Sequence, residues 1–240
     1  MSAEHEGLAP GGHAPGGGGH GPELVPIMKE FLPFLNPIPD TVIYTWIVMA
    51  FIIGIALLVR RKMEMVPRGW QNIMEMTVDG LARMVDSNLG KKGRKVVPLI
   101  ITFFIFILVC NYTGLIPTFR PPTGDLNTPA ALALIVFFTI HVIGMMEKGV
   151  FRYWKHFIEP YPFMLPLNIV EELAKPVSLS LRLFGNIMGK HVVISVLFML
   201  APFFVPIPMM MFGLFISTIQ AFVFTILTIA YLTNVMGEHH

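Results

Sequence analysis

The chain has 240 residues, of which 54% are apolar and only 13% are charged. Its mean hydropathy is +0.68. Soluble domains carry about 25% charged residues, roughly twice the share in this chain. A soluble domain of this length could not bury so much apolar surface. The 20 Phe and 17 Met exclude a disordered chain, and the single Cys excludes a disulfide scaffold. A net charge of +2 gives no indication of nucleic-acid binding. The composition therefore predicts an all-α integral membrane protein.

Residues 1–40 differ from the rest of the chain. Residues 1–22 are rich in Gly and carry scattered His, without a basic start before an apolar stretch, so we expect a polar tail and no signal peptide. Residues 24–35 are mildly amphipathic and predict a short interfacial segment. We therefore expect an N-terminal tail over residues 1–40 and a membrane domain over residues 41–240.

Apolar segments predict about five membrane-crossing helices. The first segment carries no charge and has close to the roughly 20 residues that a helix needs to cross the hydrocarbon. A helix of about 35 residues is about 52 Å long, whereas the hydrocarbon core is about 30 Å thick. The last two helices should therefore form a long, strongly tilted hairpin. The predicted spans are residues 41–59, 96–119, 128–146, 165–200 and 209–235.

Two connecting segments have patterns of their own. Residues 67–90 carry apolar side chains at helical spacing, with charged residues between them. This pattern predicts an amphipathic helix that lies in the membrane surface or docks on a partner. Before the final helix, Pro202, Pro206 and Pro208 indicate a turn.

Lys and Arg are unevenly distributed among the connections. Residues 60–95 hold nine and residues 147–159 hold three, whereas residues 1–40 and 120–127 hold one each. The positive-inside rule places the two basic segments in the cytoplasm. With five crossings, the N-terminus would then lie outside and the C-terminus in the cytoplasm.

Ionisable side chains inside a membrane helix are costly and indicate function. Arg182 is the most informative of them, because it lies about midway along the helix predicted at 165–200 and is too far from either end to reach the surface easily. The positions three and four residues away carry no carboxylate. The counter-charge of Arg182 must therefore come from another helix or another subunit.

A polar stripe surrounds Arg182. Its members follow each other by three or four residues and so share one helix face: Glu171, Lys175, Ser178, Arg182, Asn186 and Gly189. Packing of helices through small residues would explain Ser178 and Gly189, but not a guanidinium at membrane mid-depth. On the final helix, Gln220 is the polar residue nearest mid-depth, and Tyr231 is one of several residues with a hydroxyl.

Other polar residues allow two interpretations. The hydroxyls of the final helix could bond only to their own backbone. His141 could carry a proton, although a packed, hydrogen-bonded histidine explains it better. Asp125 and Asn127 could form a helix cap, or Asp125 could serve at the outer mouth of a pathway. No metal-binding, phosphate-binding or nucleophile motif is recognisable in the sequence, so we expect no metal, cofactor or catalytic centre.

The run Lys175-Pro-Val-Ser-Leu-Ser-Leu-Arg-Leu-Phe-Gly-Asn186 resembles the signature of subunit a of the F-type ATP synthase membrane sector. Residues 220–231 resemble the last helix of that family. Residues 111–117 and Asp125-Leu-Asn127 resemble its outer-loop region. The resemblance extends from about Thr41 to the C-terminus and does not include the tail.

This resemblance implies a tilted hairpin packed against a rotating ring of c subunits, each with a carboxylate at mid-membrane. Two aqueous half-channels would meet the ring from opposite sides, with Arg182 between them as the essential arginine. The expected partners are the subunit c ring, subunit b of the peripheral stalk, the rest of the complex and the lipid bilayer of a bacterial inner membrane. The protein would translocate ions without catalysing a reaction itself, and H⁺ is the favoured ion, although the sequence alone does not decide between H⁺ and Na⁺. The expected ion-pathway residues are Asn186, Gln220, His191, Ser178, Asp125, Asn127, Glu171, Glu172 and Tyr231.

One departure from the family pattern concerns its usual acid. Many members carry a carboxylate just beyond Arg-Leu-Phe-Gly-Asn or on the last helix, but here Lys190 and His191 occupy the first place and residues 209–235 contain no Asp or Glu. We predict that His191, with Asp125, acts as the relay instead, because imidazole titrates near neutrality. Lys190 either extends to the membrane surface or is a charge that tunes His191, and the first interpretation is favoured.

Two other functional classes remain alternatives on the residues alone. A stand-alone secondary transporter with an arginine-containing substrate site would carry inverted repeats, and none is visible in the sequence. An intramembrane enzyme would need a nucleophile–base pair, which the sequence does not reveal.

Overall fold

The computed structural model describes residues 25, 28–29, 37–61, 69–115, 121–151, 153, 165–200 and 206–237. Most of the predicted tail and interfacial segment therefore lies outside the described residues. The described part contains helices and no strands, which confirms the all-α prediction. Its elements are α2 (Asp40–Arg61), α3 (Trp70–Leu89), η2 (Gly90–Lys95), α4 (Val97–Thr113), η3 (Pro122–Gly124), α5 (Asn127–Lys148), α7 (Leu165–Leu200) and α8 (Pro206–Gly237).

Three of the described helices are long and apolar enough to cross a membrane, namely α2, α5 and α8. Helix α4 is apolar but has only 17 residues. The predicted span 96–119 is therefore too long, because the helix ends at Thr113 and turns at Gly114. Helix α7 differs from α2, α4, α5 and α8 because charged side chains interrupt its apolar sequence.

The two longest helices are α7, with 36 residues, and α8, with 32. Helix α7 has the predicted bounds and continues through Pro176. The expectation of a turn at Pro206 and Pro208 is wrong, because α8 begins at Pro206. A proline in the first turn of a helix is tolerated, since the N–H that it lacks would have no intrahelical partner there.

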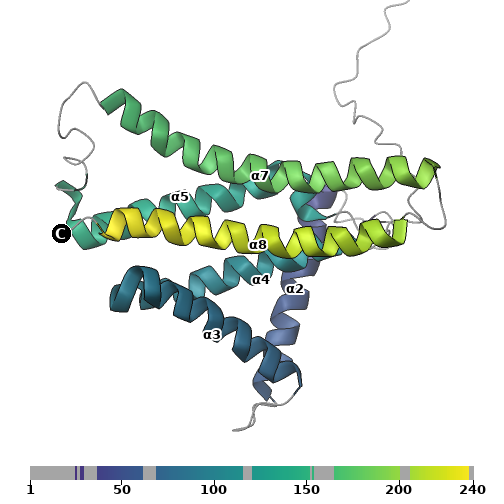
Figure 1. The fold of residues 1–240 in the computed structure, drawn as a ribbon, viewed down its shortest axis with the longest axis horizontal. Coiled ribbons are helices and arrows are strands. Elements are labelled where there is room, and N and C mark those ends of the chain that lie inside the picture. Colours follow the sequence, from purple (N-terminus) through teal and green to yellow (C-terminus); the bar gives the residue numbers. More distant parts are fainter. Residues whose placement is uncertain are drawn as a thin grey trace, which may run out of the picture.

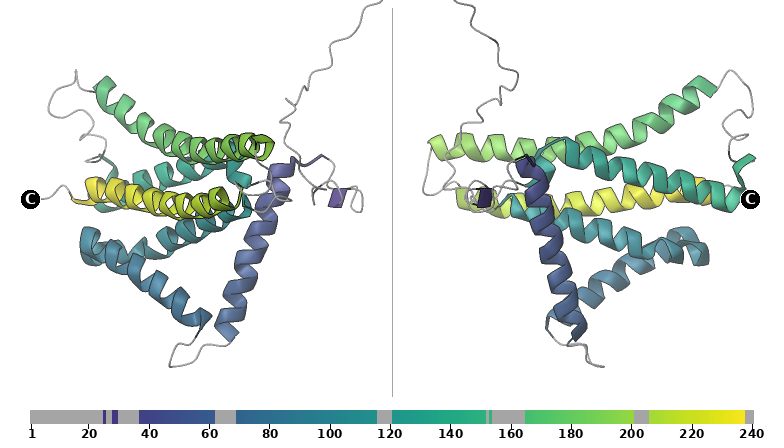
Figure 2. Two further views of the ribbon diagram at one scale, coloured as in Figure 1. Left: turned by 45° about the vertical axis from the view of Figure 1, so that its right-hand side comes forward. Right: turned by 180° about the vertical axis from the view of Figure 1, so that it is seen from behind.

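Helix α2 runs across the direction of α7 and α8, which lie alongside each other (Figures 1 and 2). A helix of 36 residues is about 54 Å long, whereas the hydrocarbon core is about 30 Å thick, so α7 would have to tilt strongly in order to lie within it. The tilt of the hairpin relative to a membrane stays a prediction.

One hydrophobic core joins α3, α4, α5, α7 and α8. Ile107 of α4, Val136 of α5 and Leu183 of α7 are among its buried side chains. The amphipathic helix α3 contributes Leu81 and Val85 to the same core. The second half of this apolar face therefore docks on its own chain, whereas Ile73 and Met76 nearer the start of α3 are exposed. Asp79 and Arg83 are exposed as well.

Two contacts fix the opposite ends of the bundle. Thr41 Oγ1 donates to Asp125 Oδ2 at 3.1 Å, which ties the start of α2 to the turn before α5. At the other end, Lys95 Nζ lies 3.8 Å from Glu147 Oε1, which joins η2 to the end of α5. The basic segment before α4 and the end of α5 therefore lie at the same end of the bundle.

Candidate functional site

Arg182 lies near the middle of α7 and is half-buried. Its Nη2 donates to Ser178 Oγ at 3.3 Å, one turn earlier on the helix. Within the described residues, no carboxylate pairs with the guanidinium. The chain thus holds Arg182 in place through a neutral hydroxyl and leaves its positive charge without a counter-charge in the described part.

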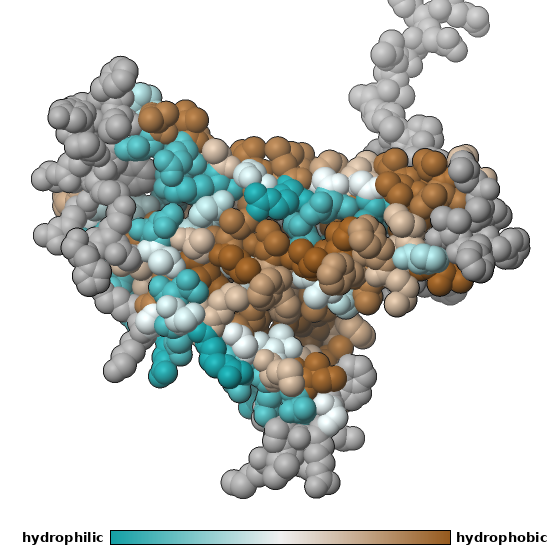
Figure 3. Space-filling model, viewed as in Figure 1, coloured by the Kyte–Doolittle hydropathy of each residue, from teal (hydrophilic) through white to brown (hydrophobic). Residues whose placement is uncertain are grey.

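The helix face around Arg182 is open. Ser178 and Asn186 are exposed, and a Cβ added at Gly185 or Gly189 would meet nothing within 4 Å. These small residues therefore do not mediate packing against another described helix of this chain. Figure 3 shows a hydrophilic stripe along α7, bordered by apolar surface. The small residues therefore leave open space along this face of α7.

Asn186 and Gln220, both expected in the ion pathway, contact each other. Asn186 Nδ2 donates to Gln220 Oε1 across the α7–α8 contact. Gln220 is only 5% exposed, so its amide depends on this partner within the bundle. The pair lies one turn beyond Arg182.

Lys190 forms the next contact along α7, which corrects the expectation that it extends to the membrane surface. Its Nζ donates to Ser217 Oγ at 2.6 Å, and Ser217 Oγ donates in turn to Gly213 O at 2.7 Å. A Cβ at Gly213 would lie 3.4 Å from Lys190 Cδ and 3.1 Å from Leu115 Cδ2. The missing side chain at Gly213 leaves the room in which the lysine stem lies.

A buried polar chain continues from Ser217 into α4. Asn111 Nδ2 donates to Ser217 O at 3.4 Å, and Thr123 Oγ1 donates to Asn111 Oδ1 at 3.3 Å. Nearby, the hydroxyls of Tyr112 and Thr218 lie 2.8 Å apart. The sequence reasoning assigned no role to Thr123 or Tyr112. The signal that could have indicated these contacts is Asn111 itself, because a buried amide in an apolar helix needs hydrogen-bond partners.

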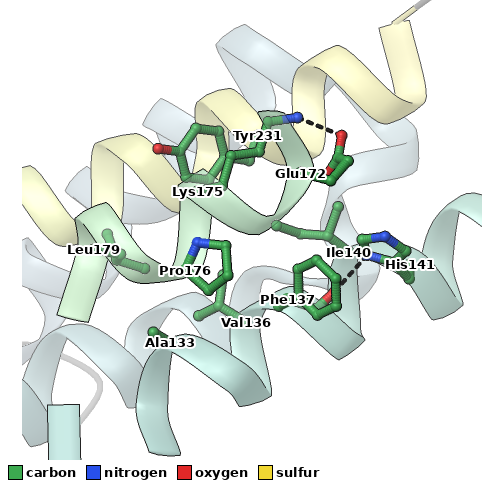
Figure 4. A pocket seen from close by; sticks show the side chains of 10 residues that line it. All are labelled: Ala133, Val136, Phe137, Ile140, His141, Glu172, Lys175, Pro176, Leu179 and Tyr231. Atoms are coloured by element: carbon green, nitrogen blue, oxygen red, sulfur yellow. Dashed lines mark hydrogen bonds and ion pairs between the residues drawn. The ribbon is translucent and has the colours of Figure 1, made fainter. Parts of the chain in front are cut away.

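A second polar group lies on the other side of Arg182. Lys175 Nζ is 2.5 Å from Glu172 Oε1 and 3.8 Å from Glu171 Oε1. The same ammonium lies 5.8 Å from the centroid of the Tyr231 ring on α8, and Figure 4 shows its bond to Glu172. The side chains of Lys175 and Glu172 are each 18% exposed, against 70% for Glu171. Glu172 is therefore the principal partner of Lys175.

His141 borders this group from α5. Its Nδ1 lies 2.9 Å from Phe137 O, and its ring centroid lies 5.9 Å from that of Tyr153. These contacts favour the interpretation of His141 as a packed, hydrogen-bonded histidine. Burial, and secondarily the charge of Glu172, raise the pKa of the Tyr153 phenol to about 12.

Asp125 is engaged by its own turn. Its Oδ1 accepts hydrogen bonds from Asn127 N at 3.2 Å and from Asn127 Nδ2 at 3.1 Å. This side-chain turn lies directly before α5, and Thr41 occupies the other carboxylate oxygen. Asp125 makes no hydrogen bond with His191, which is half-buried on α7. The two residues that we expected to act together are thus not hydrogen-bonded to each other.

The remaining hydroxyls of α8 follow the simpler interpretation. Thr225 Oγ1 donates to Ala221 O and Thr228 Oγ1 to Phe224 O, each at 2.9 Å. The site therefore consists of Arg182 on an open face, flanked by Asn186, Gln220 and Lys190 on one side and by Lys175, Glu172 and Tyr231 on the other.

Comparison with known proteins identifies the family of this chain. The family model described as ATP synthase A chain matches residues 42–233. ATP synthase subunit a of Moorella thermoacetica is 45% identical over 85% of this chain and 95% of the relative. The proteins of the same name from Trichlorobacter lovleyi and Geobacter sulfurreducens are 45% and 43% identical over 89% and 84% of this chain, and over 94% and 89% of their own lengths. The chain therefore belongs to the family of ATP synthase subunit a.

Proposed function

We propose that this chain translocates ions through the membrane sector of an F-type ATP synthase, with Arg182 controlling the release and reloading of a carboxylate on a ring of c subunits. Family membership supports the role in the membrane sector. The observation that carries the finer proposal is the half-buried guanidinium of Arg182, which has no counter-charge in the described chain. A mobile carboxylate of another subunit would supply that charge.

The electrostatics of such an encounter have the required size. A carboxylate surrounded by lipid is stable only when protonated, whereas a nearby cation favours its charged form. At about 4 Å and an effective dielectric constant of about 20, the attraction is about 4 kcal/mol. A membrane potential supplies about 2.3 kcal/mol per charge for every 100 mV. Arg182 can therefore bias deprotonation by an amount comparable with the driving force.

The polar groups on either side of Arg182 are candidates for the two half-channels. One group contains the pair Asn186–Gln220 and, one turn further along α7, a chain of bonds from Lys190 through Ser217 and Asn111 to Thr123, near the turn that contains Asp125. The other contains Glu172, Lys175 and Tyr231 and lies toward the beginning of α7. The positive-inside rule makes the second side cytoplasmic, with the N-terminus outside and the C-terminus inside a bacterial inner membrane.

His191 is proposed as the titrating relay of the outer half-channel, with H⁺ as the ion. Imidazole changes charge near neutral pH, and no Asp or Glu occurs in residues 209–235 to take that role. The variant His191→Ala should change the pH profile of ion transport. An unchanged profile in an assembled complex would rule out the relay.

The proposed partners follow from the open face of α7. Exposed Ser178, Gly185 and Gly189 allow a helix of the c ring to approach closely. Subunit b and the remainder of the complex would hold this chain in place while the ring turns.

The variant Arg182→Ala in the intact complex tests the proposal. ATP-driven acidification of membrane vesicles should disappear, while the soluble head continues to hydrolyse ATP. The control is Ser178→Ala, which removes the neutral hydroxyl bonded to Arg182 but keeps the charge, and should retain most of the pumping. Normal pumping by Arg182→Ala would contradict the proposal.

A further inference from the structure

The side chains of α7 and α8 meet in successive pairs along the hairpin. Lys190 meets Ser217, Asn186 meets Gln220, and Lys175 meets Tyr231. The number falls along α7 as it rises along α8, as two antiparallel helices require. Moving about one turn from the pair Asn186–Gln220, back along α7 and forward along α8, places Leu183 at the level of Phe224. This level lies between the second and third pairs.

This intermediate level is apolar. Leu179 is 2% exposed, Leu183 0% and Phe224 1%, and all three belong to the main hydrophobic core. The ring of Phe103 on α4 lies 6.1 Å from that of Phe224 and extends the apolar layer away from α7.

The few hydroxyls near this level do not bridge the helices. Thr225 and Thr228 each donate to a carbonyl of α8, and Ser180 Oγ donates to Val177 O at 3.0 Å within α7. Within the described residues, no polar side-chain bond joins α7 to α8 between the pair at Asn186 and the pair at Lys175. This interval is about 16 Å along α7.

We propose that Leu179, Leu183 and Phe224 form an apolar seal that keeps the two half-channels apart behind Arg182. The inference rests on the proposed function, and in it these side chains act by excluding water and charge. Successive residues of a helix point about 100° apart. Arg182 therefore lies on the open face, while Leu183, the next residue, points into the core. A charge on Arg182 alone would leave an interior route between the two polar groups, and the apolar layer closes that route because it excludes water and charge.

The test is passive proton flux through the complete ATP synthase in liposomes without nucleotides, driven by a potassium diffusion potential. Leu183→Asn places an amide in the seal and should raise the flux about tenfold or more, because a polar side chain there would retain water. Leu183→Met keeps the apolar volume and should leave the flux at the wild-type level.

Leu232→Asn is the matched control. Leu232 is also 0% exposed and lies in the same core, but it comes after Tyr231 on α8 and therefore outside the interval between the two polar groups. The same substitution there should disturb packing to a similar extent without connecting the half-channels, so its flux should remain at the wild-type level.

Two results would overturn the proposal: an assembled Leu183→Asn complex that stays tight, or an equal leak in Leu232→Asn, which would indicate general loosening. If Leu183→Asn does not assemble, the smaller change Leu183→Thr is judged by the same criteria. Failure of the seal is distinguishable from failure of the proposed function. If Leu183→Asn stays tight and Arg182→Ala fails to pump, only the proposal of the seal is contradicted. If Arg182→Ala pumps normally, both the seal and the proposed function are contradicted.

Discussion

Asn186 and Gln220 are hydrogen-bonded to each other across the α7–α8 contact, one turn from Arg182. The amide pair thus joins the helix that carries Arg182 to the helix that packs behind it. Because Gln220 is buried and Asn186 is exposed, the bond also links the bundle interior to the open face.

The amide pair should behave as one unit. Either Asn186→Leu or Gln220→Leu removes a hydrogen bond worth about 1 kcal/mol, and should lower the rate of ATP-driven proton pumping about fivefold. The double variant should pump no more slowly than the slower single variant, because residues in contact are not additive. Initial rates of vesicle acidification measure this, and losses that multiply would show that the two amides act independently.

Glu172 should matter more than its neighbour Glu171. Glu172→Gln breaks an ion pair whose two side chains are each 18% exposed, and should cost about 2 kcal/mol in stability. Glu171 is 70% exposed and 3.8 Å from Lys175, so Glu171→Gln should cost less than about 1 kcal/mol. Thermal dissociation of the purified complex compares the two variants. Equal shifts would contradict the assignment of Glu172 as the principal partner.

Gly144 is a point of close approach between α5 and its neighbours. A Cβ there would lie 2.6 Å from both Tyr153 Cε2 and Val235 Cγ1, so Gly144→Ala should destabilise the protein by about 1–3 kcal/mol. Gly54 in α2 has nothing within 4 Å of an added Cβ, and Gly54→Ala should be neutral or stabilising by up to about 1 kcal/mol. The yield and melting temperature of the complex check this. A Gly144→Ala complex as stable as Gly54→Ala would show that the contact adjusts freely.

The Tyr153 phenol should titrate later than an ordinary tyrosine. Burial and the charge of Glu172 raise its pKa from 10.0 to about 12. A raised folded-state pKa contributes stability that is present below pH 10 and is lost as the pH rises through the folded-state value. The absorbance titration of wild type minus Tyr153→Phe isolates this phenol, and a midpoint near 10 would contradict its burial.

The parts of the fold that sequence reasoning found are those with an uninterrupted local signal. Helix α7 has the predicted bounds because helical spacing continues through Pro176. The end of α4 was predicted too late because apolar residues resume beyond Gly114, although Asn111, Thr113 and Gly114 already interrupt the apolar sequence there. The start of α8 was missed because Pro206 and Pro208 are compatible with the first turn of a helix as well as with a loop.

The site shows the same division. A cation in an apolar helix is conspicuous, so Arg182 could be identified without a structure. The environment of Lys190 could not, because it depends on Ser217 and Gly213 of the opposing helix, whose register no local pattern reveals. Asp125 was paired with His191 in the prediction because of their chemistry, but its carboxylate is bound by Thr41 and Asn127 in the turn.

The central claim is that the charge of Arg182, rather than its size or its hydrogen bond to Ser178, couples ring movement to ion flow. The most direct measurement is the number of protons moved per ATP hydrolysed by the complete complex in liposomes carrying Arg182→Gln, a neutral side chain that can still bond to Ser178. The account predicts that this ratio falls to nearly zero while ATP hydrolysis persists. A ratio equal to that of the wild type would contradict it.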